Sequence, residues 1–558
     1  MKVADYIVEK LIEFGVTDAF GIPGGVILKL IYAMEKYKPR IVPHLNYHEQ
    51  MAGFAACGYA QISGKLGVAY ATRGPGITNM VTCIAEAYQE SLPVMFITAH
   101  ADISGVGKVR FEHNQELDIV SAVANFVKYG AKIEKLDDVE DCLNNAVINA
   151  MSGRKGPVIL DIASNILEKE LVMKEKYSIA NSNEKIYQSS DYVLKTIQEL
   201  LNKAKRPVIL IGDGVRNSTT QTELIILADK LGIPIVSSRA SQDLVITSKF
   251  YFGYIGSHGT RYSNFILAKA DMIIAIGNRL AFPIKSKSYA PLLENKKIIR
   301  LDIDKNEFTR KINGIINFHV DVKNILNKLF LVDTLSYDFD IWIKTCRTLK
   351  EKLNKYDLPE TVKKIGSFIE KQNSNSVFIC DVGNNEFWFA RAFEYVQKIN
   401  DVLYTKSYGT LGVALGRAIG AYYASHKEII CIIGDQGFQY NIQELNYIAS
   451  WKLPIKIILL NNHRSGMIMD HEYKLYGNNL VHVDAASGYF VPNFEKIVNG
   501  YGIEYTYDEQ VAVKKNRVVF EISTDKKEEL IPNLPKGNLC QDMEPRLDME
   551  LFEFLNHL

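Results

Sequence analysis

The sequence has few cysteines, no bias in charge and no long apolar run. Its 558 residues include only seven cysteines, none in a Cys-x-x-Cys pair. We therefore expect free, mostly buried thiols in a reducing cytoplasm, rather than a disulfide framework or a cysteine metal site. The formal net charge is +1, without a basic block or an acidic tail. This balance excludes an obvious nucleic-acid or membrane-surface binder.

Two further absences concern membranes and secretion. No segment approaches the ~18 uninterrupted apolar residues that a spanning helix needs. The first sixteen residues, MKVADYIVEKLIEFGV, carry charges throughout and predict an amphipathic helix rather than a signal peptide. The length exceeds what a single core supports, so we expect several domains.

Short apolar runs alternate with longer amphipathic segments along most of the chain. This alternation is typical of parallel sheets with crossover helices. Polar stretches at 175–191 and 331–360 resemble interdomain connectors. The sequence therefore predicts three α/β domains with mainly parallel, doubly wound sheets, at 1–170, 188–335 and 360–535, followed by a tail at 536–558. The strand-like runs are KLGVAYAT, PVMFITA, PVILDI, RPVILIGDG, MIIAIGN, KKIIRLDI, SVFICDVG, EIICIIGDQG and IKIILLNN.

A glycine-rich turn in the first domain lies between a strand and a helix. In GVAYATRGPGITNMVTCIAEAYQESLPVMFITAH (67–100), the turn is Arg73-Gly74-Pro75-Gly76. Its glycines let another group approach the backbone closely. Upstream, Glu49 stands in the apolar context HEQMAGFAA, which is unusual for a surface carboxylate.

The third domain has acidic and amide side chains at the ends of two strands. Asp435 follows the run EIICIIG, and Asn462 ends IKIILLNN. Ligands of open parallel sheets bind beyond the carboxyl ends of the strands. Asp435, Asn462 and the carbonyl of Arg464 would form an all-oxygen set suited to Mg²⁺, and the N–H groups of Gly437 and Phe438 suit a diphosphate. A helix N-cap aspartate and a turn asparagine are the alternative for either residue alone.

These motifs resemble the thiamin-diphosphate-dependent enzymes. Gly-Asp followed by Asn-Asn resembles their cofactor motif, and nearly the whole chain is similar to their acetolactate synthase branch. The resemblance implies a pyrimidine-binding, a central and a diphosphate-binding domain, in that order. Its segments are FGIPGGVIL (20–28), HEQMAGFAACGYA (48–60), TRGPGITN (72–79), NQELD (114–118), GSHGT (256–260), LDID (301–304), DVGNNEFW (381–388), YGTLGVALGRAIGA (408–421) and NNHRSGMI (461–468).

The resemblance assigns roles to individual residues. Glu49 matches the essential carboxylate that hydrogen-bonds the cofactor's pyrimidine ring, so that C2 of the thiazolium loses its proton. This role needs a carboxyl protonated near neutrality, so we expect desolvated surroundings for it. Leu411 matches the apolar residue that bends the cofactor, and Gln115 matches a glutamine that reaches the reacting carbon. Further expected cofactor contacts are Gly24, Gly74, Asn79, Gly383, Asn384, Asn385, Gly409, Gly434, Asp435, Gln436, Gly437, Phe438, Asn462, Gly466, Met467 and Ile468.

Other implications of the resemblance stay open. An ordinary core leucine is the alternative for Leu411, and a structural or a proton-transfer role is open for His113. The family builds each site across a homodimer, so a homodimer or homotetramer is expected. Acetolactate synthase also carries FAD in its central domain, and whether this chain does is undecided. The matching positions are Gly214, Gly256, His258, Arg279 and Asp302.

The chain departs from acetolactate synthase where that enzyme binds its second keto acid. Pro283 stands in place of the arginine that recognises the acceptor carboxylate, and His471 replaces a tryptophan. Proline cannot form a charge-assisted pair, and histidine adds a donor and an acceptor. The pocket therefore favours an aldehyde, a ketone or a keto sugar. The tail resembles proteins of surface-polysaccharide pathways, which include a carboligase acting on a nucleotide-linked keto sugar.

Three functions remain. The chain could decarboxylate a 2-keto acid, in the first instance pyruvate, and transfer the acyl carbanion to a non-acid carbonyl. It could be an acetolactate synthase with an unusual pocket. It could also be a catalytically silent homologue that binds or assembles, although the presence of Glu49, Asp435 and Asn462 argues against this.

Overall fold

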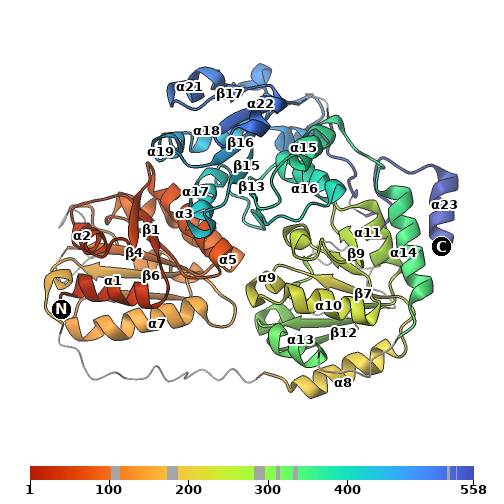
Figure 1. Ribbon diagram of the computed structural model, residues 1–558, viewed down its shortest axis with the longest axis horizontal. Helices are drawn as coiled ribbons and strands as arrows, with labels where there is room; N and C mark the ends of the chain where they lie inside the picture. The colour runs from red at the N-terminus through yellow and green to blue at the C-terminus, as the bar shows by residue number, and fades with distance from the viewer. Residues whose placement is uncertain are drawn as a thin grey trace. The chain divides into compact units, whose positions relative to one another are not determined.

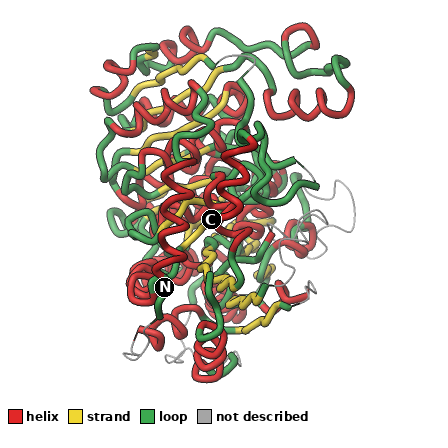
Figure 2. The backbone as a smooth tube through the Cα atoms, turned by 90° about the vertical axis from the view of Figure 1, so that its right-hand side faces the viewer, coloured by secondary structure: helices red, strands yellow, loops and turns green. Residues whose placement is uncertain are grey.

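The computed structural model describes residues 1–101, 114–171, 187–281, 296–309, 314–330, 337–524, 528–535 and 537–558. Within these residues the strands form three sheets of six strands each. Neighbouring strands in each sheet run parallel. Helices lie beside the strands of each sheet (Figures 1 and 2). The predicted fold class, three α/β domains with parallel sheets, is confirmed.

The first sheet has the order β2-β1-β3-β4-β6-β5. Alternate side chains of its strands enter two cores: Val68 and Tyr70 of β3 pack in one and Ala69 in the other. The strands are β1 (Asp18–Gly21), β2 (Val42–Leu45), β3 (Gly67–Tyr70), β4 (Val94–His100), β5 (Tyr129–Ile133) and β6 (Val158–Ala163). The sheet is therefore buried on both faces, as parallel sheets usually are.

Different helices cover the two faces of this sheet. Residues of α1 (Val3–Glu13), α2 (Leu28–Lys36) and α7 (Val139–Met151) fill the core that contains Val68. Residues of α3 (Glu49–Ser63) and α5 (Val81–Glu90) fill the core that contains Ala69. The predicted N-terminal amphipathic helix is thus α1. The short helices α4 (Pro75–Thr78) and α6 (Ile119–Ala122) complete this region.

The third sheet belongs to the same compact unit as the first and has the order β14-β13-β15-β16-β18-β17. Its strands are β13 (Val377–Cys380), β14 (Val402–Tyr404), β15 (Ile429–Gly434), β16 (Ile455–Asn461), β17 (Tyr505–Thr506) and β18 (Val518–Ser523). Its helices are α17 (Ala414–Ser425), α18 (Asp435–Tyr440), α19 (Glu444–Ser450), α20 (Gly466–Tyr476), α21 (Phe494–Gly500) and α22 (Glu509–Lys514). Helix α16 (Asn384–Val396) begins in this unit, and from Phe387 onward its residues belong to the second unit.

Helices α3 and α17 pack backbone against backbone and join the first and third sheets in one core. A Cβ atom at Gly420 would lie 1.8 Å from the Ala55 oxygen, and one at Gly58 would lie 2.3 Å from the Arg417 oxygen. Only glycine permits these approaches. The small residues of both helices therefore set the position of α3, and with it the position of Glu49 at its N-terminus.

The central sheet belongs to a second compact unit and has the order β12-β11-β10-β7-β8-β9. Its strands are β7 (Pro207–Ile211), β8 (Ile235–Ser237), β9 (Tyr251–Tyr254), β10 (Met272–Ile276), β11 (Lys297–Asp302) and β12 (Ile315–His319). The helices of this unit include α8 (Ser190–Leu201), α9 (Gly214–Ser218), α10 (Gln221–Leu231), α11 (Arg261–Lys269), α13 (Val322–Phe330), α14 (Asp340–Leu353), α15 (Glu360–Glu370) and α23 (Met549–His557).

One predicted connector and the tail pack within this unit. The 331–360 stretch contains α14, whose Trp342 Nε1 donates to the Pro207 oxygen at 2.9 Å, so this part packs on the central sheet. The tail also packs there, since Arg261 donates to the backbone oxygens of Met543 and Pro545. Most of the 175–191 stretch lies outside the described residues. The exact domain bounds stay a prediction.

All seven cysteines are free, and six of them are buried, while Cys142 is half-buried. The expectation of free thiols is confirmed. Across the described residues, no helix is both long enough and apolar enough to cross a membrane.

Candidate functional site

Glu49 is the first residue of α3, after the end of β2. The side chain of His48 caps the helix by accepting a hydrogen bond from Gln50 N at 3.1 Å. The Glu49 carboxylate accepts a hydrogen bond from Asn79 Nδ2 at 2.9 Å. Its neighbours Met51 and Ala52 are fully buried, but Glu49 itself is only half-buried in the single chain. The desolvation expected for it is therefore incomplete within one chain.

The glycine-rich turn brings further predicted residues to Glu49. Gly74 has φ +62°, and a Cβ there would lie 2.6 Å from the Gln115 oxygen. A Cβ at Gly76 would lie 3.5 Å from Glu49 Oε1, and one at Gly24 would lie 2.4 Å from Thr72 Cβ. The structure thus gathers Gly24, Gly74, Asn79 and Gln115 around the turn beside Glu49. Their proposed roles stay predictions.

Asp435 begins α18 at the end of β15 and is 3% exposed. Its Oδ1 accepts a hydrogen bond from Gln436 N at 2.9 Å, whereas Oδ2 is buried and accepts none from the described residues. Burial raises the pKa of the carboxyl to about 7, and nearby backbone N–H groups, first that of Gln436, offset part of this rise. A buried carboxylate oxygen without a protein partner is costly unless something else binds it.

The amides of Asn462 and Asn384 meet at a glycine close to the next strand end. A Cβ at Gly466 would lie 2.7 Å from Asn462 Nδ2 and 2.9 Å from Asn384 Nδ2. Asn462 Oδ1 accepts a hydrogen bond from Arg464 N at 3.2 Å. The Asn384 amide is buried, and neither its nitrogen nor its oxygen has a hydrogen-bond partner among the described residues. Asp435 Oδ2 and the Asn384 amide are thus buried polar groups without a hydrogen-bond partner among the described residues. Their chemistry fits Mg²⁺ and a diphosphate.

Three more predicted contacts flank this set. Gly383 has φ +115°, and a Cβ there would lie 3.0 Å from Asn385 Oδ1. A Cβ at Gly434 would lie 3.3 Å from the same oxygen. Asn385 Nδ2 donates to the Asp381 backbone oxygen at 2.6 Å. Asn385 is therefore a bridge between the ends of β13 and β15.

The residues from 405 to 412, which we call the Leu411 loop, lie between β14 and α17. Gly409 has φ +76°, and the Leu411 side chain is half-buried rather than part of a core. Gly412 N donates to Asp381 Oδ2 at 2.8 Å, and Val382 N donates to Asp381 Oδ1 at 2.8 Å. Burial raises the pKa of Asp381 to about 7. Asp381 therefore ties the loop to the end of β13.

Sequence reasoning missed Asp381 and also Glu444. Glu444, on α19, accepts hydrogen bonds from Tyr47 N at 2.9 Å and from Asn46 Nδ2 at 3.2 Å, next to Glu49 in the chain. Burial raises its pKa to about 7. Asp381 could have been found, because it directly follows an apolar strand as Asp435 does. Glu444 is the first residue of α19, and its partners are 398 and 397 positions away in the sequence, so no local signal marks it.

The predicted acceptor residues have different outcomes. His471 is exposed on α20, as are Met467 and Ile468 one turn earlier. Gln436 Oε1 accepts a hydrogen bond from Ser465 Oγ at 3.0 Å, just before α20. Pro283 and His113 lie outside the described residues.

In the central domain, the positions expected for FAD contact other parts of the protein. Gly214 packs on Gly277, since a Cβ at Gly214 would lie 2.7 Å from the Gly277 Cα. His258 Nδ1 lies 3.3 Å from the Pro532 oxygen, and the ring lies 4.6 Å from that of Phe387. Gly256 has φ +146°, Asp302 Oδ1 accepts a hydrogen bond from Asp304 N at 2.9 Å, and Arg279 is half-buried.

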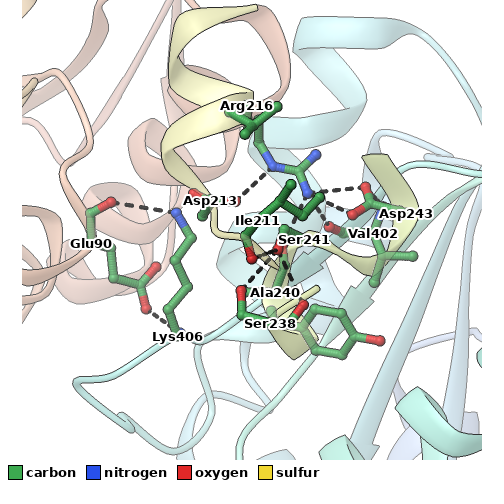
Figure 3. Close-up of polar contacts among 12 residues, drawn as sticks. Glu90, Ile211, Asp213, Arg216, Ser238, Ala240, Ser241, Asp243, Val402 and Lys406 are labelled. Atoms are coloured by element: carbon green, nitrogen blue, oxygen red, sulfur yellow. Dashed lines mark hydrogen bonds and ion pairs between the residues drawn. The ribbon is translucent and has the colours of Figure 1, made fainter. Parts of the chain in front are cut away.

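The turn after β7 also contains an aspartate with protein partners. Arg216 Nε donates to Asp213 Oδ1 at 3.0 Å, and Arg216 Nη2 donates to Asp243 Oδ1 at 2.7 Å (Figure 3). The Asp213 carboxylate thus has an arginine partner three residues further along the chain. Contacts within the protein therefore account for Gly214 and Asp213 in this turn. FAD binding stays an open prediction.

Three family models match the chain. They are the N-terminal TPP binding domain of thiamine pyrophosphate enzymes at residues 1–122, the central domain at 194–329, and the C-terminal TPP binding domain at 381–523. The two TPP-binding models cover the two regions in which the Glu49 and Asp435 clusters lie.

Relatives match over almost the full length. The chain is 30% identical to the acetolactate synthase large subunit of Lactococcus lactis subsp. lactis, over 96% of the chain and 95% of the relative. It is 31% identical to probable acetolactate synthase large subunits of Methanococcus aeolicus, over 90% of the chain and 87% of the relative, and of Methanocaldococcus jannaschii, over 96% and 91%. From the site and these matches, we conclude that the chain belongs to the thiamin-diphosphate-dependent, acetolactate synthase-like enzymes.

Proposed function

We propose that this chain is a Mg²⁺-dependent carboligase that decarboxylates pyruvate and transfers the acyl carbanion to a carbonyl acceptor other than a 2-keto acid. A nucleotide-linked keto sugar is the acceptor class that we favour. The observation that carries the cofactor part is Asp435, a buried carboxylate whose Oδ2 has no hydrogen-bond partner among the described residues.

The residues proposed to hold the cofactor lie at the ends of β15 and β16. Asp435, Asn462 and the carbonyl of Arg464 supply oxygen ligands for Mg²⁺. The N–H groups of Gly437 and Phe438, in the first turn of α18, would bind the diphosphate, and the Asn384 amide is a further donor. Thiamin diphosphate supplies a carbon nucleophile that adds to the keto carbon and accepts the electrons left by CO₂.

Glu49 and Gln115 are the proposed proton-handling and orienting groups. Glu49 would exchange a proton with the pyrimidine ring, and Asn79 fixes its carboxylate at 2.9 Å. Gln115 packs on Gly74 in the same cluster and would hydrogen-bond near the reacting carbon. Because Glu49 is half-buried in one chain, a second copy would have to complete its surroundings. This supports a homodimer or homotetramer.

The acceptor is argued from Pro283 and His471. The carboxylate-binding arginine of acetolactate synthase has no counterpart at Pro283, and His471 offers a hydrogen-bonding group on the exposed side of α20. A hydroxylated acceptor would use such a group, whereas a second pyruvate would lack its charged partner.

We further propose a cytoplasmic location, which agrees with seven free cysteines.

Acetolactate synthesis is the second candidate, favoured by the names of the relatives at 30–31% identity. The test is to incubate the protein with thiamin diphosphate, Mg²⁺ and pyruvate, with and without an added aldehyde or keto sugar, and to identify the products. We expect the mixed coupling product to exceed acetolactate. Efficient acetolactate formation that an added acceptor does not divert would establish the alternative, and no CO₂ release would indicate a silent homologue.

Flavin is tested separately. If the chain uses FAD as acetolactate synthase does, the purified protein will show a flavin absorbance spectrum and release FAD on denaturation. Its absence after expression with excess riboflavin would remove FAD from the proposed cofactors without affecting the Mg²⁺ site.

A further inference from the structure

A cluster of buried charges joins helix α5 to helix α17. Arg417 on α17 donates through Nη2 to Glu86, and also to Glu90 Oε2 at 2.8 Å. Both glutamates lie on α5, one turn apart, and all three side chains are buried. Arg417 Nη1 also donates to the Tyr404 oxygen at 3.0 Å, at the end of β14. The cluster therefore contacts the segment from which the Leu411 loop leaves the sheet.

Glu90 holds the start of this loop directly. Its Oε1 accepts a hydrogen bond from Lys406 N at 2.6 Å, and its backbone oxygen lies 3.4 Å from Lys406 Nζ (Figure 3). At the other end, Gly412 N donates to Asp381 Oδ2 at 2.8 Å, and Asn441 Nδ2 donates to the Gly412 oxygen at 3.3 Å. Side chains thus hold both ends of the Leu411 loop, with Gly409 and Leu411 between them.

The same helix approaches Glu49 at its other end. Helix α5 begins at Val81, two residues after Asn79, which binds the Glu49 carboxylate at 2.9 Å. A ten-residue helix is a stiff rod of about 15 Å. One element therefore sets both the position of Asn79 and the position of the Leu411 loop.

Stability is a poor explanation for such a cluster. Buried ion pairs seldom stabilise more than well-packed apolar residues do, because both charges lose their hydration. Two carboxylates share one guanidinium here, and burial raises the pKa of Glu86 to about 7. An apolar side chain at position 90 could not accept a hydrogen bond from a backbone N–H group. Glu90 accepts one from Lys406 N.

We infer that Glu90 is a positioning residue for the reaction, which sets the place of Leu411 and Gly409 through its hydrogen bond to Lys406 N. This inference rests on the proposed function, in which the Leu411 loop contacts the cofactor. A displacement of about 1 Å in such a contact costs roughly 10²-fold in rate. The effect should appear in cofactor activation and in kcat, with little change in KM for pyruvate.

The experiment compares Glu90→Ala and Glu90→Gln with a control that breaks a distant ion pair. Glu428→Ala is suitable, since Glu428 pairs with Lys456 at 3.1 Å and, among the described residues, has no hydrogen bond to the Leu411 loop. The readouts are the melting temperature, the thiamin diphosphate bound per chain, and the exchange of its C2 hydrogen with deuterated solvent at saturating cofactor. Exchange is calculated per bound cofactor, so partial unfolding does not enter.

We expect Glu90→Ala to slow exchange about 10²-fold, and Glu428→Ala to lower the melting temperature with exchange unchanged. Glu90→Gln keeps an acceptor for Lys406 N, so it should recover most of the rate. Wild-type exchange in Glu90→Ala, or equal slowing in both alanine variants, would overturn the inference. If Glu90→Ala does not fold, Glu90→Leu takes its place, because leucine fills a similar volume without an acceptor for Lys406 N, and a wild-type exchange rate in Glu90→Leu overturns the inference. A wild-type protein that does not accelerate exchange would instead overturn the proposed function, and this inference with it.

Discussion

Two strand ends in this chain carry the same three residues, Ile-Gly-Asp, yet differ in chemistry. At the end of β7, Asp213 pairs with Arg216 at 3.0 Å, and the following Gly214 packs on Gly277. At the end of β15, Asp435 has an Oδ2 atom that is buried and accepts no hydrogen bond from the described residues. Burial raises the pKa of Asp435 to about 7.

The difference shows that the local motif alone does not define a ligand site. Both turns follow an apolar parallel strand and precede a helix, so both are at the edge where such sheets bind ligands. In the central domain the protein satisfies the carboxylate itself. In the C-terminal domain, Asp435 Oδ2 and the amide atoms of Asn384 are buried without a hydrogen-bond partner among the described residues, which suits the proposed ligand.

The largest expected effect separates the two aspartates. Asp435→Ala should abolish retention of thiamin diphosphate, because Mg²⁺ would lose its anionic protein ligand. Asp213→Ala should leave retention unchanged and lower only stability, through the lost pair with Arg216. The measurement is the cofactor content of each variant after gel filtration in Mg²⁺ buffer. Normal content in Asp435→Ala would place the metal site elsewhere.

The second prediction concerns Glu49, which lies in the same compact unit as Asp435. Glu49→Gln should keep the fold and the bound cofactor, since glutamine can still accept from Asn79. It cannot exchange the proton, so exchange of the C2 hydrogen should slow by about 10²- to 10⁴-fold. Nuclear magnetic resonance of the quenched cofactor measures this rate, and a wild-type rate would remove Glu49 from the mechanism.

The third prediction addresses the acceptor. Pro283→Arg combined with His471→Trp should shift products toward acetolactate by about 10- to 100-fold, which corresponds to a charged hydrogen bond of roughly 1.5–3 kcal/mol. Each single variant serves as a control that separates the added charge from the added bulk. Product ratios from competing pyruvate and aldehyde test it. A wild type that already prefers pyruvate as acceptor would refute the pocket argument.

The fourth prediction concerns stability rather than turnover, and it is the pH dependence that Glu444 adds to the free energy of unfolding. Burial raises its pKa to about 7, so the folded chain holds a proton that the unfolded chain has released above about pH 4.3. This contribution to the free energy of unfolding is therefore largest at low pH, falls as pH rises to about 7 and is constant above that. The fall is on the order of 3 kcal/mol.

Glu444→Gln should remove this slope. Denaturant titrations between about pH 4.3 and pH 8 give the free energy of unfolding of the wild type and the variant. The difference between these two free energies should change with pH below about pH 7 and stay constant above it. Parallel curves across the whole range would mean that Glu444 is already ionised throughout.

The predicted runs include strands of four to seven residues, and the missed strands include the buried six-residue β18 as well as shorter ones. All nine predicted runs lie in strands of the structure, among them β7, β15 and β16. The strand β2 contains a proline, and β14 and β17 have three and two residues, so none of them has a readable period. Their pairing depends on the sheet beside them.

The site divides in a similar way. Glycine turns, Asp435 and Asn462 are visible because their chemistry follows from their place at a strand end. Arg417, Glu86 and Glu90 are not, because the partners are more than 300 positions apart and meet only when α5 packs on α17. Two glutamates one turn apart, in a helix whose other residues are mostly apolar, are the one local feature that points to this cluster.

The most direct test of the central claim is the binding of thiamin diphosphate to the wild-type protein at increasing Mg²⁺. We expect one cofactor per chain, bound only when Mg²⁺ is present, with the same stoichiometry in Asp213→Ala and none in Asp435→Ala. Binding that does not need Mg²⁺, or that survives in Asp435→Ala, would contradict it.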